Sequence, residues 1–474
     1  MKGRPIAVDL DGTLFVDDSA WENLRFIILR NPTKLPALLI QAFFGRASLK
    51  DWLHREAGAS RNPPAIRQEL LARLLSEKKK GRAVHLVSGA PQDLVEATAK
   101  RLGFNLRLKH WGSSSQSNLT FSKKELLVKT FGVRGYDYYG DRKIDIPIFK
   151  NAERGAIVGA RPAVVQRALR ANPRLETMSP KPAFASAALR ALRPHQWVKN
   201  LLLLVPLFSA HIWGEVENWI LAGQAFVAFS LLSSAVYLLN DLYDLDSDRA
   251  HPQKKMRPLA CRELKYSEAL MLIILLLASA FGLAFFLGQE FLFIAFTYFV
   301  LAVFYNIWAK RKAGLDLIML ASFYTLRILA GGAAVEIICS PWLLGFAIFI
   351  FLSLACIKRV SELLRLKADA QLRAKGRGYG TGDMEAIAGI GIASGVVSIL
   401  VAALYVNSPD VSVLYSRPQS LWFLCPLLFY WIIRVWLKTF RKEMEEDPVL
   451  FAIKDRASWG VLLLAIVTVF IASR

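Results

Sequence analysis

An acidic stretch directly follows a long apolar run. Residues 226–239 are almost wholly apolar, and the chain then reads Asn240-Asp241-Leu242-Tyr243-Asp244-Leu245-Asp246-Ser247-Asp248. If a helix continues through both, Asp241, Asp244 and Asp248 fall at i, i+3 and i+7 and share one face. Clustered carboxylates need a cation, and hard oxygen ligands suit Mg²⁺, which bridges carboxylates to substrate phosphates. We therefore expect a metal site on Asn240, Asp241, Asp244 and Asp248. The alternative is a solvated acidic loop.

Basic residues follow this acidic stretch within a few positions. Lys254, Lys255 and Arg257 stand beside the carboxylates in sequence. Acids that hold a metal and bases that hold phosphate oxygens are together what a diphosphate site requires. These three side chains are thus candidates for binding a diphosphate.

A second set of chemical groups lies at the ends of predicted strands near the N-terminus. A short apolar strand runs into Asp9-Leu10-Asp11-Gly12-Thr13, a second ends in Ser88-Gly89, and a third ends in Gly140-Asp141. Lys123 lies between the last two, and Asp145 follows Asp141 by one helical turn. Parallel α/β sheets bind ligands at the carboxyl ends of their strands, so these groups are expected to meet there.

This ordered set of motifs resembles the haloacid-dehalogenase phosphohydrolase superfamily. The resemblance implies that Asp9 is a nucleophile, that Asp11 is an acid/base, and that Ser88 and Lys123 hold the transferred phosphoryl group. It also implies Mg²⁺ on Asp9, Asp11, Asp141 and Asp145. A carboxylate that attacks a phosphate needs such cations to offset the repulsion. Lys124 is a rival to Lys123, and an inactive domain of the same fold is the alternative interpretation.

Composition identifies the rest of the chain as membrane protein. The chain of 474 residues is 54% hydrophobic and has a formal net charge of +22. From residue 193 onward it holds about nine apolar segments of membrane-spanning length, near residues 199–212, 217–240, 268–287, 290–308, 315–337, 342–357, 385–406, 420–436 and 457–472. Nucleic acid is not expected as a partner, because no nucleic-acid-binding module is found. The four cysteines have no metal-ligand spacing.

Lysines and arginines concentrate in alternate connections of the membrane half. The connection that carries the acidic stretch is among the basic ones, so the positive-inside rule predicts that it faces the cytosol. Residues 1–9 contain no signal-peptide core, so the first domain is also expected in the cytosol. We expect a multi-pass protein of the bacterial inner membrane, with both active sites cytosolic and the C-terminus on the far side.

The predicted architecture combines two fold classes. Residues 1–171 are expected to form an α/β, Rossmann-like haloacid-dehalogenase fold with a small cap inserted at about 18–82. The cap's interrupted apolar stretch, residues 24–44, is expected to cover the phosphatase site and to lie on the membrane. Residues 172–190 are expected to be a linker, and residues 191–474 an all-α polytopic bundle.

The membrane half resembles the UbiA-type intramembrane prenyltransferase superfamily, and within it the decaprenyl-phosphate phosphoribosyltransferase branch. The similarity rests on the acidic stretch and on motifs at matching loops: Arg193-Pro194-His195-Gln196-Trp197-Val198-Lys199-Asn200, Arg249-Ala250-His251-Pro252, Leu326-Arg327, Lys358-Arg359 with Glu362-Leu363, and Asp447-Pro448 with Asp455-Arg456. Aromatic prenyltransferases usually carry a second Asp-x-x-x-Asp motif. Here Met319 and Ala321 stand where its second acid would fall after Asp316.

That resemblance implies phosphoribosyl pyrophosphate as donor, a polyprenyl phosphate as acceptor and Mg²⁺ as cofactor. Asp241, Asp244 and Asp248 would hold the metal on the diphosphate leaving group. Arg327 lies in an apolar run, where a charge costs about 2.5–3.5 kcal/mol, so it needs an anionic partner or access to the interface. Further candidates for substrate binding are Lys199, Asn200, Tyr305, Lys310, Asp316, Lys358, Arg359, Glu362 and Tyr379.

The two halves are chemically complementary. Phosphoribosyl transfer would leave a 5-phosphate on the lipid product, and a tethered phosphatase could remove it, giving polyprenyl-phosphoryl ribose for a cell-wall pentose. Two alternatives stay open: an aromatic-acceptor prenyltransferase with an unrelated phosphatase domain, and a non-enzymatic transporter with a regulatory domain. Acids at one cytosolic face, away from the bilayer midplane, argue against the transporter. A homo-oligomer also stays open.

Overall fold

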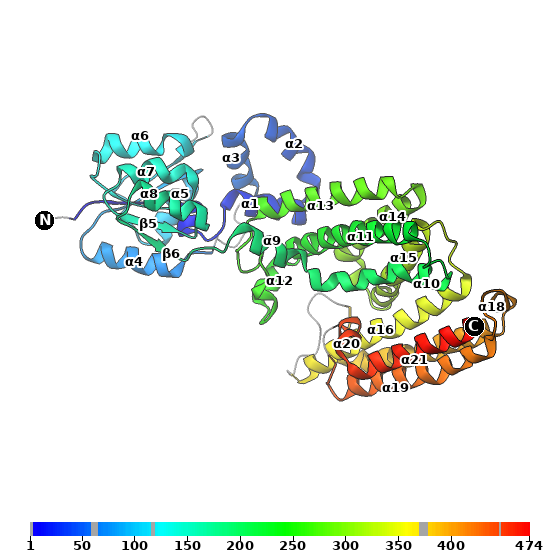
Figure 1. Cartoon of the computed structure of the whole chain (residues 1–474). Helices are drawn as coiled ribbons and strands as arrows, with labels where there is room; N and C mark the ends of the chain where they lie inside the picture. The colour runs from blue at the N-terminus through cyan, green and yellow to red at the C-terminus, as the bar shows by residue number, and fades with distance from the viewer. Residues whose placement is uncertain (1–2, 58–64, 115–118, 369–377, 445–446) are drawn as a thin grey trace. The chain divides into compact units, whose positions relative to one another are not determined.

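The computed structural model describes residues 3–57, 65–114, 119–368, 378–444 and 447–474 (Figure 1). The chain divides into two compact units. The first contains residues 1–191 together with residues 241–270, and the second contains residues 192–240 and 271–474. The connection that carries Asp241 to Lys265 is therefore packed with the N-terminal α/β part of the chain.

The first unit is built on a six-stranded parallel sheet. Its strand order is β3-β2-β1-β4-β5-β6. The strands are β1 (Ile6–Val8), β2 (Val84–Pro91), β3 (Trp111–Ser113), β4 (Asp137–Gly140), β5 (Gly155–Val158) and β6 (Leu175–Met178). β1 pairs with both β2 and β4, so the strand order reverses beside β1, and open α/β sheets bind ligands at the carboxyl ends of the strands at such a point. The predicted Rossmann-like fold is confirmed.

Helices cover both faces of this sheet. Alternate residues of β1 enter different cores: Ile6 and Val8 pack with α4 (Gln68–Lys79) and α5 (Gln92–Arg101). Ala7 packs with α6 (Leu119–Phe131), α7 (Ile146–Asn151) and α8 (Pro162–Ala171). All residues of β1, β2, β4 and β5 are buried, as expected for parallel strands covered on both sides.

The insert after β1 is shorter than the sequence predicts. An isolated antiparallel bridge between Phe15 and Ile66 closes its base. Between them lie α1 (Ser19–Arg30), the 3₁₀ turn η2 (Pro32–Lys34), α2 (Leu35–Phe43) and α3 (Arg46–Ala57). α4, expected to belong to the cap, instead buries Leu70 and Leu74 against the sheet.

Regular structure continues through the residues expected to be a linker. β6 pairs in register with β5 along its whole length and forms one edge of the sheet. α9 (Phe184–Leu192) follows and buries Ala187, Ala188 and Ala191. The four residues of β6 are too few, and too mixed in polarity, for their sequence to predict a strand.

The second unit consists of helices. Its long helices are α11 (Val216–Tyr243), α13 (Tyr266–Phe286), α14 (Gln289–Ile307), α15 (Leu315–Ala334), α16 (Pro341–Ala368), α17 (Met384–Val406), α19 (Leu424–Phe440) and α21 (Arg456–Ser473). The end of α11 and the start of α13 belong to the first unit. Short elements complete it: η5 (Pro194–Leu204), α10 (Val205–Ser209), η7 (Ala309–Arg311), η8 (Thr381–Asp383), α18 (Pro409–Leu414), η9 (Pro418–Phe423) and α20 (Pro448–Lys454).

Eight helices in the described residues are long and apolar enough to cross a membrane. They correspond to eight of the nine apolar segments that the sequence predicts as spans. The remaining segment, near residues 199–212, forms the 3₁₀ helix η5 and then the short helix α10. The chain is therefore a multi-pass membrane protein.

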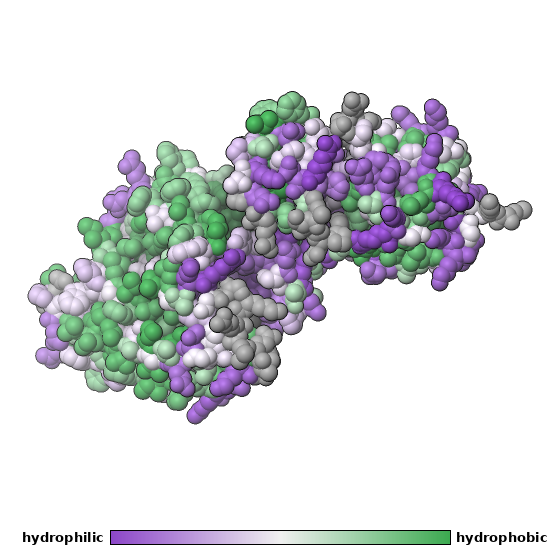
Figure 2. All heavy atoms as spheres, turned by 180° about the vertical axis from the view of Figure 1, so that it is seen from behind, coloured by the Kyte–Doolittle hydropathy of each residue, from purple (hydrophilic) through white to green (hydrophobic). Residues whose placement is uncertain are grey.

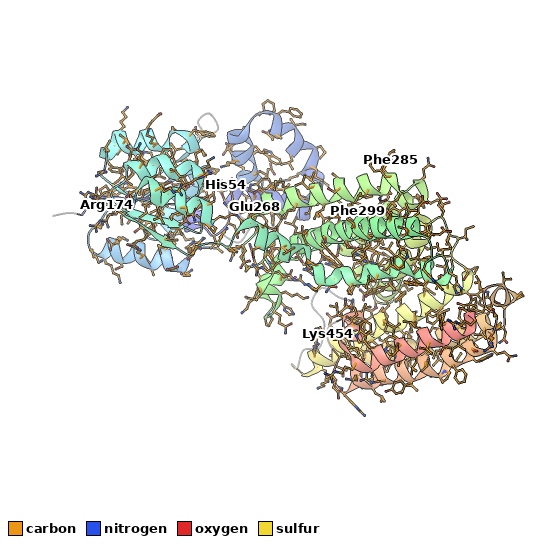
Figure 3. All side chains as sticks on the ribbon, in the orientation of Figure 1. His54, Arg174, Glu268, Phe285, Phe299 and Lys454 are labelled. Atoms are coloured by element: carbon orange, nitrogen blue, oxygen red, sulfur yellow. The ribbon has the colours of Figure 1, made fainter. Side chains whose placement is uncertain are left out.

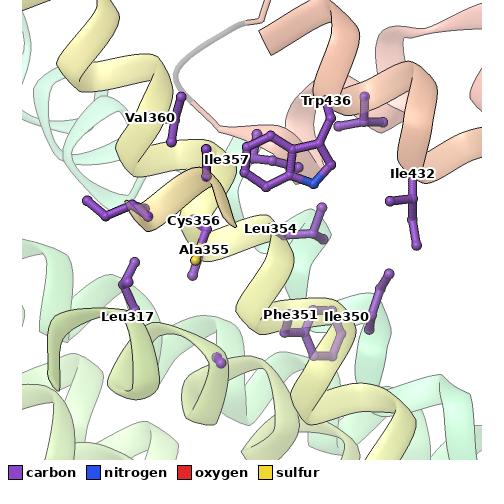
Figure 4. Packing of buried hydrophobic residues seen from close by; sticks show 14 of the residues in the cluster. Leu317, Ile350, Phe351, Leu354, Ala355, Cys356, Ile357, Val360, Ile432 and Trp436 are labelled. Carbon is purple, nitrogen blue, oxygen red and sulfur yellow. The ribbon is translucent and has the colours of Figure 1, made fainter. Parts of the chain in front are cut away.

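The core of the second unit lies around α16. Ile350, Phe351 and Leu354 pack between Leu317 of α15 and Ile432 and Trp436 of α19 (Figure 4). A Cβ on Gly331 would lie 2.1 Å from the carbonyl oxygen of Leu203, so only glycine allows η5 to approach α15 this closely.

Apolar side chains also cover much of the outside of this unit. Figure 2 shows broad hydrophobic areas there, as expected of a surface that faces lipid. Phe285, labelled in Figure 3, is 70% exposed, and the adjacent Phe286 is 84% exposed.

Candidate active sites

The nucleophile predicted from the sequence lies at the carboxyl end of the central strand β1. The Asp9 carboxylate accepts a hydrogen bond from the Leu10 N–H at 2.8 Å and forms an ion pair with Lys123 of α6, with Nζ 2.6 Å from Oδ2. Burial by itself would lower the pKa of Lys123, but Asp9 and Asp145 raise it overall. Lys123 is therefore the lysine that faces the nucleophile, as the sequence analysis favoured.

Three buried carboxylates next to this ion pair form a candidate metal centre. Ligand atoms of Asp9, Asp141 and Asp145 all lie within 4.8 Å of one another. Gly12 makes this approach possible, because its φ is +80° and a Cβ there would lie 2.3 Å from Asp141 Oδ2. The donor set is all hard oxygen, which fits Mg²⁺.

Asp145 is held by several donors at once. Tyr138 donates its hydroxyl to Oδ1 at 2.9 Å, and the backbone N–H groups of Asp141 and Arg142 donate to Oδ2. Burial raises the pKa of Asp145 to about 6. The raised pKa means that burial disfavours the charged form of Asp145. A bound cation would stabilise that form.

Asp11 points away from this metal centre. Its carboxylate accepts from the Ser19 N–H, at the start of cap helix α1, at 2.9 Å. It is not a member of the three-carboxylate group, and its role as a metal ligand stays a prediction. Burial, followed by the charge of Asp18, raises its pKa to about 6. A carboxyl group with this pKa holds a proton for part of the time near neutral pH, which suits an acid/base.

Two residues near these carboxylates, Arg142 and Lys50, were not singled out by sequence reasoning. Arg142 bonds Asp18 at 2.7 Å, and its Nε lies 3.5 Å from Asp141 Oδ1. Lys50 of cap helix α3 donates to the carbonyl of Gly89 at 3.3 Å. Ser88 is fully buried beside it and accepts from the Ala90 N–H at 3.2 Å. The cap thus brings a cation to the strand end that carries Ser88, a contact that no sequence spacing reveals.

The acidic stretch does not form the continuous helix that the sequence predicts. α11 ends at Tyr243, and α12 (Leu245–Ala250) begins after Asp244, whose φ and ψ are −89° and 7°. Asp241 therefore lies before the break, Asp244 at it and Asp248 after it. In the described residues these three do not form a three-carboxylate metal group like that of Asp9, Asp141 and Asp145.

Asp241 and Asp248 nevertheless meet at one cation. Arg257 Nη1 lies 3.1 Å from Asp241 Oδ1 and 2.6 Å from Asp248 Oδ2, and both acids are buried. Burial raises the pKa of Asp248, although Arg257 opposes this shift. Two hard carboxylates are enough for Mg²⁺ when a substrate supplies phosphate oxygens. This arrangement fits a metal–diphosphate site held by two aspartates and one arginine.

Four of the residues predicted to bind substrate in the membrane half contact one another. Arg359 Nε and Nη2 donate to the two carboxylate oxygens of Asp316 at 2.6 and 3.0 Å. The Tyr305 hydroxyl donates to Asp316 at 2.8 Å, and Arg359 also pairs with Glu362. Arg359 and Asp316 are 1% and 0% exposed, so this is a buried ion pair between α15 and α16.

A second cluster joins Lys199 of η5, Lys358 of α16 and Asp447. Lys199 hydrogen-bonds Asp447, and Lys358 Nζ lies 3.7 Å from the same oxygen. Burial alone would raise the pKa of Asp447, but the two lysines lower it to about 2. Asp447 was recognised in the sequence only as part of a motif, without a site role.

Arg327 is a buried cation among neutral oxygens. It is 3% exposed and donates to Asn200 at 2.8 Å, to the Tyr298 hydroxyl at 2.9 Å and to the Phe323 carbonyl at 2.6 Å. Its guanidinium also lies 4.9 Å from the Tyr298 ring centroid. Among the described residues no carboxylate forms an ion pair with it. A buried cation without a counter-ion is a strong attractor for an anion.

The remaining predicted residues lie near these clusters in the chain. Asn240 is on α11 next to Asp241, and Lys254 and Lys255 form the turn η6 (Lys254–Met256) before Arg257. Lys310 is buried in η7, and the Tyr379 hydroxyl accepts from the Gly314 N–H at 2.7 Å.

Comparisons with known proteins agree with the architecture. Residues 201–459 match the model of the UbiA prenyltransferase family. An uncharacterised protein, y4nM, of Sinorhizobium fredii is 33% identical over 460 residues, which cover 96% of this chain and 89% of that protein. A decaprenyl-phosphate phosphoribosyltransferase of Mycolicibacterium smegmatis is 34% identical over 202 residues, which cover 42% of this chain and 64% of that protein. The predicted resemblance of the membrane half is thus confirmed.

A solved structure also matches the N-terminal part. A substrate-bound phosphoserine phosphatase superposes with a TM-score of 0.27 and 18% identity, covering 38% of this chain and 94% of that one.

Proposed function

Because the chain belongs to the UbiA prenyltransferase family, we propose that it transfers 5-phosphoribosyl from phosphoribosyl pyrophosphate to a polyprenyl phosphate. We propose further that its N-terminal domain removes the 5-phosphate from the product. The observation that carries the first part is the similarity to decaprenyl-phosphate phosphoribosyltransferases, at 34% identity. The name of that relative contains two anionic groups, a lipid phosphate and a phosphoribosyl group. Such groups are chemically matched to the site of Asp241, Asp248 and Arg257 and to Arg327.

Asp241 and Asp248 would hold the diphosphate end of the donor through Mg²⁺. Bound there, Mg²⁺ would supply positive charge that stabilises the diphosphate leaving group. Arg257 is already in contact with both carboxylates and can donate to diphosphate oxygens from the same position. The acceptor is an anion, so no protein nucleophile is needed for this step.

Arg327 is the side chain best suited to an anionic phosphate within the membrane half. It is held in place by Asn200 and Tyr298, and none of its partners in the residues that the structure describes is charged. Lys199 and Lys358, by contrast, already contact a carboxylate, that of Asp447. We therefore assign the phosphate of the polyprenyl acceptor, or the 5-phosphate of the donor, to Arg327 rather than to these lysines.

Hydrolysis of the 5-phosphate would proceed at the carboxyl end of β1. Asp9 attacks the phosphorus, and the ester oxygen leaves with the proton that Asp11 donates. Asp11 then takes a proton from water as the water attacks the aspartyl-phosphate and releases inorganic phosphate. Lys123 and Ser88 hold the phosphoryl oxygens, and Mg²⁺ on Asp9, Asp141 and Asp145 would offset their negative charge.

Both reactions would take place on the cytosolic side of the inner membrane. The density of lysine and arginine in the connection of residues 241–265 supports this orientation. The lipid product would then stay on the side of the membrane where the phosphatase domain is tethered, which raises its effective concentration there.

The transfer proposal is tested with purified protein in lipid nanodiscs, labelled phosphoribosyl pyrophosphate and a polyprenyl phosphate. Asp248→Asn should abolish label transfer to lipid while hydrolysis of a soluble phosphomonoester continues. Asp246→Asn is the matched control, because Asp246 is exposed and pairs with Arg25 instead of Arg257. Transfer by the Asp248→Asn protein at the wild-type rate would refute the proposal, as would labelling from an isoprenyl diphosphate and an aromatic acid alone.

A further inference from the structure

Cations from two distant parts of the sequence gather beside the phosphatase metal centre. Lys265 Nζ lies 3.6 Å from Asp141 Oδ2, and Arg262 Nε lies 2.7 Å from Asp17 Oδ2. Both belong to the connection that carries the acidic stretch. Arg67 and Lys181 of the α/β fold complete the group, which we call the cationic cluster: Arg67, Lys181, Arg262 and Lys265.

The connection is held against the α/β fold by several further ion pairs. Arg249 bonds Asp17 at 2.8 Å, and Arg161 reaches Glu268 at 3.1 and 2.5 Å (Glu268 is labelled in Figure 3). Arg190 pairs with Glu263. These contacts lie on both sides of Arg262 and Lys265 in sequence, so they fix the position of the two cations relative to the phosphatase site.

The cationic cluster carries more positive charge than its acidic neighbours offset. Asp17 already binds two arginines, Arg249 and Arg262. Within the described part of the chain, Arg67 donates to the backbone carbonyls of Thr13 and Gly12, at 3.2 and 3.4 Å, and to no carboxylate. These carbonyls belong to the same turn that carries Asp9 and Asp11, so Arg67 lies at the edge of the catalytic site.

Lys181 is the member of the cluster that most clearly lacks a partner. Its backbone N–H donates to Ala160, but no ion pair or side-chain hydrogen bond of its ammonium is found among the residues that the structure describes. Burial, reinforced by the Lys265 ammonium, lowers the pKa of Lys181 to about 8. Holding like charges together in this way is unfavourable unless an anion joins them.

We propose that the cationic cluster is a second anion subsite of the phosphatase, which binds a further phosphate group of the substrate. This inference rests on the proposed phosphatase function and specifies its substrate class: a sugar phosphomonoester that carries a phosphodiester at another carbon. The C5 phosphate would react at Asp9, while the C1 phosphodiester that links ribose to the lipid would bind the cluster. Lys265 and Arg262 make the specificity of the phosphatase depend on the connection that also carries Asp241 and Asp248.

The test compares two soluble substrates with the full-length protein. One is ribose 5-phosphate, and the other is ribose 5-phosphate with a methyl phosphodiester at C1. The wild-type protein should have a KM for the second compound that is lower by roughly tenfold or more, the size expected from charge-assisted hydrogen bonds. Lys265→Ala and Lys181→Ala should each remove this preference, so that kcat/KM falls more on the compound with the C1 phosphodiester than on ribose 5-phosphate.

Two controls separate the possible outcomes. Lys265→Arg should retain the preference, and so should Lys150→Ala, which removes an exposed lysine at the end of α7. A preference that persists in both alanine variants would overturn the second subsite, as would equal losses on both compounds. If the wild-type protein hydrolyses neither compound, the proposed phosphatase function itself fails, and the subsite with it.

Discussion

The buried ion pair of Arg359 and Asp316 allows a test of whether Arg359 stabilises the fold or contacts the substrate. Arg359→Met removes both charged donors from Asp316, which then keeps the Tyr305 hydroxyl. Removing one partner of a fully buried ion pair costs about 3–5 kcal/mol, because the other charge stays in a medium of low polarity. Arg359→Met combined with Asp316→Asn leaves no such charge, so the double variant should be more stable than Arg359→Met alone by about 2 kcal/mol or more.

The assay is unfolding in mixed micelles followed by tryptophan fluorescence, together with phosphoribosyl transfer in nanodiscs. If the pair only positions α15 against α16, the double variant should recover both stability and a large part of the transfer activity. Additive losses of stability in the two single variants would refute the ion-pair reasoning. A double variant that is stable but inactive would show instead that Arg359 contacts the substrate.

Three further predictions follow from the first unit. Asp11→Asn should slow hydrolysis of an alkyl phosphate by roughly 10²–10⁴-fold, with a much smaller loss on p-nitrophenyl phosphate, whose leaving group needs no proton; equal losses would contradict the acid role. Because the pKa of Lys181 is lowered to about 8, its positive charge is lost above that pH. The KM for the substrate with a C1 phosphodiester should therefore rise above about pH 8, and Lys181→Arg should abolish this rise. Phe43 of α2 is 92% exposed, beside Ile40 and Phe44, which are also exposed. A nitroxide label can be attached to Phe43→Cys in a protein from which the four native cysteines have been removed. In nanodiscs this label should be more accessible to oxygen than to a water-soluble nickel complex, because we expect the cap to lie on the membrane. The reverse order of accessibility would show that the cap lies in water.

The grouping of Asp9, Ser88 and Asp141 could be predicted because it follows from the carboxyl ends of parallel strands. Asp9 and Asp141 come directly after β1 and β4, Ser88 lies in the second half of β2, and parallel strands place their carboxyl ends at one edge. The direction in which Asp11 points could not be predicted. It depends on the Ser19 N–H at the start of the cap, a contact that only the folded insert creates.

The membrane half was predictable in its spans but not in its ion pairs. Apolar length alone predicted eight long helices, whereas the mixed 3₁₀ and α structure of residues 194–209 has no periodic signature in the sequence. The break of α11 after Tyr243 was also unforeseen, since no Gly or Pro marks it. Arg359 and Asp316 lie 43 residues apart, so their pairing depends on helix packing that a single sequence does not reveal.

The central claim, that one chain first ribosylates a lipid and then dephosphorylates it, is tested most directly by mass spectrometry of the lipid product. Wild-type protein and Asp9→Asn are each incubated in nanodiscs with phosphoribosyl pyrophosphate, Mg²⁺ and a polyprenyl phosphate. We expect polyprenyl-phosphoryl ribose from the wild type, and from Asp9→Asn the same lipid heavier by one phosphate. Identical products from both proteins, or no ribosylated lipid from either, would contradict the account.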